Sequence, residues 1–278
     1  MEKKEFQQAL LQWYAANKRD LPWRKTTDAY KILVSEIMLQ QTQVSRVIPK
    51  YEVFLERFPT AHVLARAPPA DVITLWAGLG YNRRAVNLQK AAKAVCVHGS
   101  FPTTSLGLQE LPGIGPYTAA AVASFSYNDR VAVVDTNVIR VLSRLFFGVE
   151  TAGKEKVSRL AQQLVPEDAR TWNNAVMEFG ALICAATPQC PSCPFSSDCP
   201  ALKNGFPEGV PKIKQSPFEG SSRQARGKIL AILRGKKVET AQALSQEIKL
   251  SLLKTKKLLA GLEKDGLVVI ENKGVRLP

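Results

Sequence analysis

The sequence predicts a mostly α-helical protein with a four-cysteine loop and a small C-terminal winged helix. Three observations predict this fold class. Apolar residues recur at helical spacing through most of residues 1–205. Four of the five cysteines crowd into residues 184–199, and a stretch rich in Pro, Gly and Ser separates this part from a segment of different pattern. We therefore expect a helical domain over 1–205, a linker over 206–222 and a winged helix-turn-helix over 223–278.

The first domain is predicted to contain a series of helices. A polar, Pro-containing break follows the first of them, and residues 131–134 are expected to be an extended lead-in to a helix that begins near Asn137. The other helices are predicted over 5–17, 29–58 (as two helices), 70–79, 83–97, part of 106–126, 154–164 and 169–185.

The last fifth of the chain has the pattern of a winged helix. One helix is predicted over 223–233, a second is capped by Thr240 and ends near Ile248, and a third is capped by Ser251 and ends near Lys264. Two short apolar segments follow and are predicted to form a hairpin closed by residues 272–274.

The charge balance indicates a polyanionic partner. The net charge is +14 and the pI is about 9.7, and residues 221–278 hold 13 Lys/Arg against 5 Asp/Glu, a net of +8. Nucleic acid is the first candidate and a membrane surface is the competitor. No apolar run approaches the roughly 18–20 residues that a membrane span needs. The N-terminus does not resemble a secretory signal, so we expect a soluble, cytoplasmic protein.

The clustered cysteines indicate a metal centre. Cys184, Cys190, Cys193 and Cys199 have the spacing C-x5-C-x2-C-x5-C, and four thiolates in one short loop suit either a [4Fe–4S] cluster or a tetrahedral zinc ion. Their neighbours include three prolines and few apolar residues, which argues against four unrelated cysteines in a core. The spacing does not separate iron–sulfur from zinc. Cys96 stands apart, and we expect it to be a small buried apolar residue.

The string LPGIGPYTAAAVASF, residues 111–125, predicts a helix-hairpin-helix motif. Gly113 and Gly115 permit a tight turn, and Pro116 suits the first turn of the next helix. Such a turn aims successive backbone N–H groups outward and can bind a phosphate. An ordinary turn between two helices is the alternative.

Two carboxylates are candidate catalytic groups. Asp135 precedes the helix that begins near Asn137, where most acids serve only as caps. Glu36 lies in VSEIMLQQTQV, residues 34–44, with apolar neighbours on its helical turn. Partial burial there would raise its pKa and make it a general acid, although an acid on an amphipathic helix is more often solvated. Gln40 and Gln41 offer amide groups that can read a base edge.

Together these strings closely resemble the helix-hairpin-helix DNA glycosylases, and among them the MutY-type adenine glycosylases. They are LPWR, SEIMLQQTQV, GLGY, LPGIGPYTAAA, VVDTNV and the four-cysteine loop, in that order, over about residues 5–205. The resemblance implies two helical lobes with DNA across a cleft, a [4Fe–4S] cluster, and duplex DNA carrying a mismatch as the partner. We expect a monomer that associates with the nucleoid through DNA.

The resemblance also implies roles for single residues. Asp135 would stabilise the positive charge on the sugar, with Asn137 in the same pocket, and Glu36 would protonate the leaving adenine and then assist water. Tyr117 stands where strand-cleaving relatives carry a lysine, which implies a monofunctional enzyme. The remaining DNA or substrate contacts that it implies are Arg24, Gln40, Gln41, Tyr81, Asn82, Gly113 and Gly115, whereas Trp23 is expected to be packing.

The sequence departs from the family pattern at three places. Asn82 replaces a second tyrosine after GLGY, and the first cysteine spacing is one residue shorter than usual. A winged helix also stands where many MutY-type enzymes carry a NUDIX-like domain, and its Lys254, Lys256 and Lys257 are predicted DNA contacts. Two alternatives stay open: a glycosylase for thymine or uracil opposite guanine, and a non-catalytic iron–sulfur DNA-binding regulator.

Overall fold

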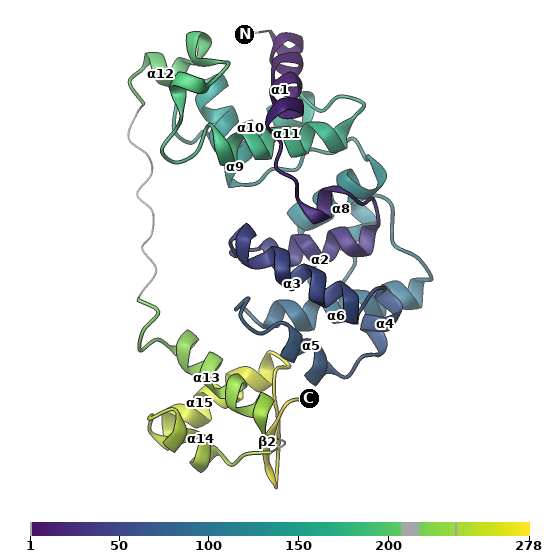
Figure 1. Ribbon diagram of the computed structural model, residues 1–278, viewed down its shortest axis with the longest axis vertical. Coiled ribbons are helices and arrows are strands. Elements are labelled where there is room, and N and C mark those ends of the chain that lie inside the picture. Colours follow the sequence, from purple (N-terminus) through teal and green to yellow (C-terminus); the bar gives the residue numbers. More distant parts are fainter. Residues whose placement is uncertain (1, 207–216, 237) are drawn as a thin grey trace. The chain divides into compact units, whose positions relative to one another are not determined.

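The computed structural model describes residues 2–206, 217–236 and 238–278 (Figure 1). Its described residues fall into two compact units. The first unit comprises 2–33, 102–110 and 114–206, and the second comprises 34–101, 111–113 and the C-terminal part from 217 onward. Most of the predicted linker, residues 207–216, lies outside the described residues, so the proposed domain boundaries stay a prediction.

The chain is mostly helical, as predicted. None of the described helices is long and apolar enough to cross a membrane. The first unit contains α1 (Lys3–Asn17), α7 (Ser105–Gln109), α8 (Pro116–Tyr127), α9 (Thr136–Leu142), α10 (Lys154–Gln163), α11 (Ala169–Leu182) and α12 (Pro200–Lys203). The second contains α3 (Val44–Arg57), α4 (Ala61–Arg66), α5 (Pro69–Leu75), α6 (Arg83–His98), α13 (Ser222–Gly235), α14 (Ala241–Glu247) and α15 (Leu252–Lys264). The chain passes from the first unit to the second within α2 (Ala29–Leu39).

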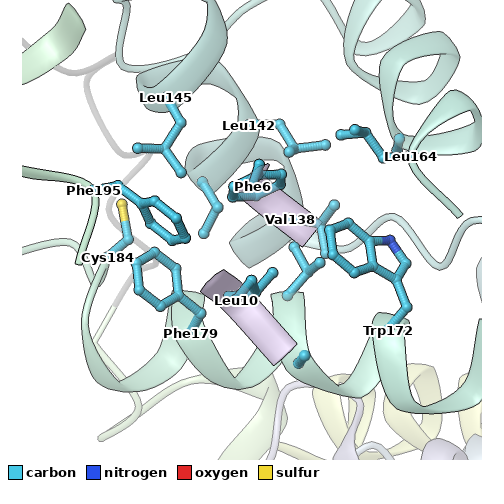
Figure 2. Packing of buried hydrophobic residues seen from close by; sticks show 14 of the residues in the cluster. Phe6, Leu10, Val138, Leu142, Leu145, Leu164, Trp172, Phe179, Cys184 and Phe195 are labelled. Carbon is cyan, nitrogen blue, oxygen red and sulfur yellow. The ribbon is translucent and has the colours of Figure 1, made fainter. Parts of the chain in front are cut away.

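The core of the first unit forms around α1. Phe6 and Leu10 lie one helical turn apart and are fully buried against Trp172 and Phe179 of α11 (Figure 2). The ring of Phe6 meets that of Trp172 edge to face at 5.6 Å, an arrangement that adds to the burial energy. This core fixes α9 and α11 against each other.

Residues 143–147 are a departure from the expected helix. α9 ends at Leu142 and is followed directly by a π-helical segment, Ser143–Phe147, which ends at Gly148 in the left-handed conformation. Such π segments are rare and their extra residue per turn changes which side chains face the core. Here the segment buries Arg144 rather than exposing it.

The C-terminal part contains the predicted elements. α13, α14 and α15 are capped by Ser221, Thr240 and Ser251, whose hydroxyls each accept a backbone N–H three residues on. Strands β1 (Val269–Glu271) and β2 (Gly274–Arg276) then pair antiparallel, with Ile270 opposite Val275. Glu239 forms a further antiparallel bridge to Val275, so the hairpin is linked back to the start of α14.

Candidate active site and four-cysteine loop

Asp135 is the N-cap of α9. Its carboxylate accepts hydrogen bonds from the Val138 N–H at 2.7 Å and from the Asn137 amide at 2.7 Å. Burial raises the pKa of Asp135, whereas these hydrogen bonds and the charge of Arg140 lower it, and the net pKa is above the usual range. The carboxylate is therefore fixed in position and poorly solvated, which strengthens its attraction for a nearby positive charge.

The extended segment before Asp135 is tied down by Asn173. This buried side chain accepts the Val133 N–H at 3.0 Å and donates to the Val131 carbonyl and the Ser124 hydroxyl, each at 2.9 Å. Asn173 thus pairs the backbone groups of residues 131–133 that no strand partner satisfies. The structure confirms the predicted extended lead-in and shows what holds it.

Arg140 connects Asp135 to the cysteine loop. Its guanidinium donates to the Asn137 side-chain oxygen at 2.8 Å, and to the carbonyls of Gly180 and Cys184, both at 2.7 Å. Asn137 in turn donates to Asp135. Sequence analysis missed Arg140, although its position one turn after Asn137 on the same helix face was a usable signal.

Gly180 allows α9 and α11 to approach closely. A Cβ atom at this position would lie 2.7 Å from the Cβ of Asn137 and 3.1 Å from a methyl group of Val141. Because those distances are below van der Waals contact, any side chain at 180 would displace the helix that begins at Asp135.

Glu36 lies in a fully buried stretch of α2. Residues 32–38 are all buried, and Glu36 itself is only 5% exposed. The helix is therefore not amphipathic here, and the solvated alternative for Glu36 is wrong. A buried carboxyl group is costly unless it has partners, so it is uncommon outside functional sites. Its role as general acid stays a prediction.

Two loops of the second unit carry strained backbone. Gln41 and Tyr81 have φ values of +55° and +45°, which side-chain-bearing residues rarely adopt. Tyr81 follows Gly78 and Gly80, which also have positive φ, and its side chain is 47% exposed. Such strain concentrates at functional sites. Asn82, half-buried, precedes the first residue of α6, and Gln40 is half-buried at the end of α2.

Arg84 holds both loops together. Its side chain lies over the rings of Trp76 and Tyr81, at 5.4 and 5.8 Å from their centroids. Burial lowers the pKa of Arg84 to about 10. Its two terminal nitrogens donate to the carbonyls of Ile37, Met38, Gln40, Leu79 and Gly80 and to the Thr42 hydroxyl, at 2.6–3.1 Å. Sequence analysis missed this residue because most of its partners are backbone carbonyls, and those of Ile37, Met38 and Gln40 are distant in sequence.

Arg84→Met is expected to destabilise the protein by about 3 kcal/mol or more, because several buried carbonyls lose their only charged donor. The midpoint of urea unfolding measures this change. Arg66→Lys on exposed α4 is the control and should unfold like the wild type. Equal midpoints for Arg84→Met and the control would contradict this role of Arg84.

The hairpin between α7 and α8 has the predicted turn. Gly113 has φ +77°, and a Cβ atom there would lie 2.7 Å from the Cβ of Asn87. Glycine is therefore required both by conformation and by space. Gly115 caps α8, Pro116 occupies its first turn, and Tyr117 follows as a half-buried residue.

Arg24 is part of a buried ion-pair network. Its terminal nitrogens donate to the two Glu178 oxygens at 3.0 and 2.8 Å, and Arg19 donates to the same carboxylate. Burial alone would raise the pKa of Glu178, but the hydrogen bonds from Arg19 and Arg24 outweigh it and lower the pKa to about 2. Trp23, beside Arg24, is buried, as expected for packing.

This network predicts an acid-dependent loss of stability. The folded-state pKa of Glu178 is about 2 and its ordinary value is 4.5, so its stabilising effect is complete above pH 4.5 and is lost as the pH falls towards 2. The difference in free energy of unfolding between wild type and Glu178→Gln should be largest near neutral pH and shrink across this window. Urea unfolding at a series of pH values measures it, and a constant difference would contradict the network.

The four loop cysteines line one pocket of the first unit. Cys184 follows α11, Cys190 and Cys193 flank a 3₁₀ turn, and Cys199 precedes α12. Burial raises the pKa of Cys193 to about 11. Within the described residues, no three Cys, His, Asp or Glu side chains are grouped closely enough to hold a single metal ion.

The surroundings of these cysteines differ from the sequence expectation. Cys184 and Cys199 are buried in the core that contains Phe6, Phe179 and Phe195. Figure 2 shows Cys184 beside Phe179 and Phe195. The argument that no core surrounds them was wrong, because α1, distant in sequence, and the preceding helix α11 supply one. Buried Arg144 donates to the Cys184 sulfur at 3.6 Å and pairs with Glu150 at 2.7 Å, which places a positive charge beside the thiols.

The remaining predicted residues are exposed or half-buried. Lys254, Lys256 and Lys257 are all exposed on α15. Cys96 is half-buried on α6, rather than fully buried as expected.

Comparison with known proteins gives consistent matches. Residues 34–167 match the family model described as HhH-GPD superfamily base excision DNA repair protein. The chain is 44% identical over 232 residues to the adenine DNA glycosylase of Mycolicibacterium smegmatis, covering 81% of this chain and 79% of that protein. It is 41% identical over 236 residues to the human adenine DNA glycosylase, covering 76% of this chain and 43% of that protein.

Solved structures have the same fold. A thermostable thymine-DNA glycosylase matches with a TM-score of 0.68 and 31% identity, covering 73% of this chain and 97% of that one. A trapped endonuclease III–DNA covalent intermediate matches with a TM-score of 0.63 and 24% identity, covering 74% and 99%.

Proposed function

Because this chain belongs to the HhH-GPD superfamily of base excision DNA repair proteins, we propose that it is an adenine DNA glycosylase acting on adenine paired with guanine or 8-oxoguanine. The observation that carries this proposal is the 44% identity to an adenine DNA glycosylase over about four fifths of both chains. The buried Glu36 and the half-buried Asp135, which caps α9, supply the two acids that the reaction needs.

The two carboxyl groups divide the chemistry. The adenine first leaves the base stack, which costs least at a mismatch. Glu36 donates a proton to a ring nitrogen of the adenine, and the glycosidic bond breaks with its electron pair moving to the base. The Asp135 carboxylate stabilises the cation left on the sugar. Water then adds to the sugar carbon and returns a proton to Glu36.

Other residues bind the substrate or limit the chemistry. Tyr117 cannot form the Schiff base that strand cleavage by a lysine requires, so the enzyme is monofunctional. Gln41 and Tyr81, held in strained conformations, fill the gap left by the flipped base. Gly113 and Gly115 present the hairpin backbone to a phosphate.

The donor set of the loop fits a [4Fe–4S] cluster held by Cys184, Cys190, Cys193 and Cys199. A zinc ion would need all four sulfurs about 2.3 Å from one point. The four thiols line one pocket and, within the described residues, are not grouped around a single point, so they would suit a cluster better than a single ion. Cys184, whose carbonyl accepts a hydrogen bond from Arg140 at 2.7 Å, would be fixed in place when the group is bound.

Thymine or uracil opposite guanine is the second candidate target, since a thymine-DNA glycosylase matches at 31% identity. A buried acid at Glu36 favours adenine, because a pyrimidine that leaves as an anion depends less on protonation.

A panel of duplexes that vary the target base and the base opposite it tests the function. After incubation and treatment with alkali, cleavage of the adenine strand is expected. Cleavage confined to a thymine or uracil strand would establish the second candidate. Binding without any cleavage would instead favour a DNA-binding regulator.

A further inference from the structure

The C-terminal part is docked on the second unit. Ile73 of α5 belongs to the same buried cluster as Leu230, Leu259 and Val275, and Val86 of α6 packs against that cluster. The Pro278 carbonyl accepts the Ala70 N–H at 3.0 Å. These contacts join both ends of the C-terminal part to residues 70–86.

An ion-pair network secures this docking. Asp265, in the turn after α15, pairs with Arg226 of α13 and, at 3.5 Å, with Arg83 of α6. Val86 of α6 packs against the buried cluster of the C-terminal part. The end of α15 is therefore held on α6 by an ion pair and by apolar contact.

The acidic residues of the C-terminal part are all engaged elsewhere. Asp265 serves the docking contact, Glu239 and Glu247 both pair with Lys236, and Glu271 pairs with Arg276. Glu263 accepts the Ile270 N–H at 3.1 Å, and Glu219 accepts a hydrogen bond from the Gln224 amide at 2.8 Å. None of them pairs with a lysine of α15 in the described structure, and α15 carries four lysines against one acid, Glu263.

One side of α15 collects this charge. Thr255, Leu259 and Leu262 are buried, and the opposite side is exposed. We call this exposed side the lysine face, and it consists of Leu253, Lys254, Lys256, Lys257, Ala260 and Lys264, with Glu263 also exposed at its edge.

We propose that the lysine face binds phosphates of the duplex that carries the target base, at a fixed distance from that base. The proposal rests on the proposed function, which brings the duplex to this protein. Lysines bind phosphates as point charges without reading sequence, so the face adds affinity and not base selection. Since α15 is docked, its contact falls on one flank of the target base.

The test compares full-length Lys254→Ala/Lys256→Ala/Lys257→Ala with a control that removes equal charge from exposed α10, Lys154→Ala/Lys156→Ala/Arg159→Ala. The logarithm of the binding constant for an undamaged duplex falls with the logarithm of salt by about 0.9 per phosphate contact. The α15 variant is expected to lower this slope by about 2–3, while the control keeps the wild-type slope.

The flank requirement is tested by binding to mismatched duplexes, with Asp135→Asn in both proteins to prevent turnover. Shortening the duplex on one side of the target base should abolish the difference in affinity between the protein with wild-type α15 and the triple-alanine variant. Shortening it on the other side should leave that difference unchanged. Equal dependence on both sides would contradict a docked face.

Other outcomes separate the two proposals. A wild-type slope for the α15 variant, in a protein that excises adenine, would overturn the lysine face alone. The lysine face would also be overturned if these lysines were needed for binding to phosphatidylserine vesicles but did not affect the salt dependence of DNA binding. A wild type that excises no adenine would instead overturn the proposed function, whatever the slopes.

Discussion

Asp135→Asn is expected to lower the rate of adenine release by about a thousand-fold or more while duplex binding stays within a few-fold of wild type. The substitution removes the negative charge but keeps a side-chain oxygen, and asparagine caps helices as well as aspartate does. The Val138 N–H, now 2.7 Å from the carboxylate, therefore retains an acceptor. The expected loss is electrostatic and not structural.

Single-turnover excision and equilibrium binding, measured on the same mismatched duplex, separate these effects. An unchanged melting temperature would confirm that the cap survives. In the wild type, the rate should fall with decreasing pH at a higher pH than an ordinary aspartate would give, because burial raises the pKa of Asp135 and the ionised form is the active one. Binding lost in parallel with excision would show that Asp135 is only a cap.

Glu36→Gln is expected to reduce the rate of adenine excision by about a hundred- to ten-thousand-fold. Glutamine has nearly the same shape and can keep hydrogen bonds within the buried stretch of α2, but it has no acidic proton to give to the base. Duplex binding is therefore expected to persist. Single-turnover excision and binding on an adenine–guanine duplex measure both quantities.

The leaving group supplies a control for Glu36. On a duplex whose target purine leaves without protonation, Glu36→Gln should lose much less of the excision rate than on adenine, because only the assistance to water is removed. An equal loss on both substrates would mean that Glu36 positions the helix and donates no proton. Undiminished adenine excision by the variant would refute the acid role outright.

Much of the fold was predictable because its signals are local. Helix periods, the caps at Asp135, Thr240 and Ser251, and the hairpin glycines each depend on residues within about one turn of each other. The elements of the C-terminal part were found close to the predicted positions for the same reason. The short helix α4 was missed, since six residues give too little periodicity.

The supports of the candidate site were not predictable in the same way. Arg84, Arg140 and Asn173 act by hydrogen bonds to backbone carbonyls or amides 40 or more residues away. Every residue type has a backbone carbonyl, so the sequence does not indicate which carbonyls will accept these hydrogen bonds. Burial of Cys184 was missed because part of its apolar surroundings comes from α1, which is distant in sequence.

The hydrogen bonds of Arg84 limit which insertions and deletions this protein can accept during evolution. One guanidinium binds carbonyls from the segment after Glu36 and from the Leu79–Gly80 turn. An insertion or deletion in either segment would pull those carbonyls out of reach and leave the other segment unsupported. The lengths of the two loops are therefore coupled. A change in the number of residues in one loop is tolerated only with a compensating change in the other.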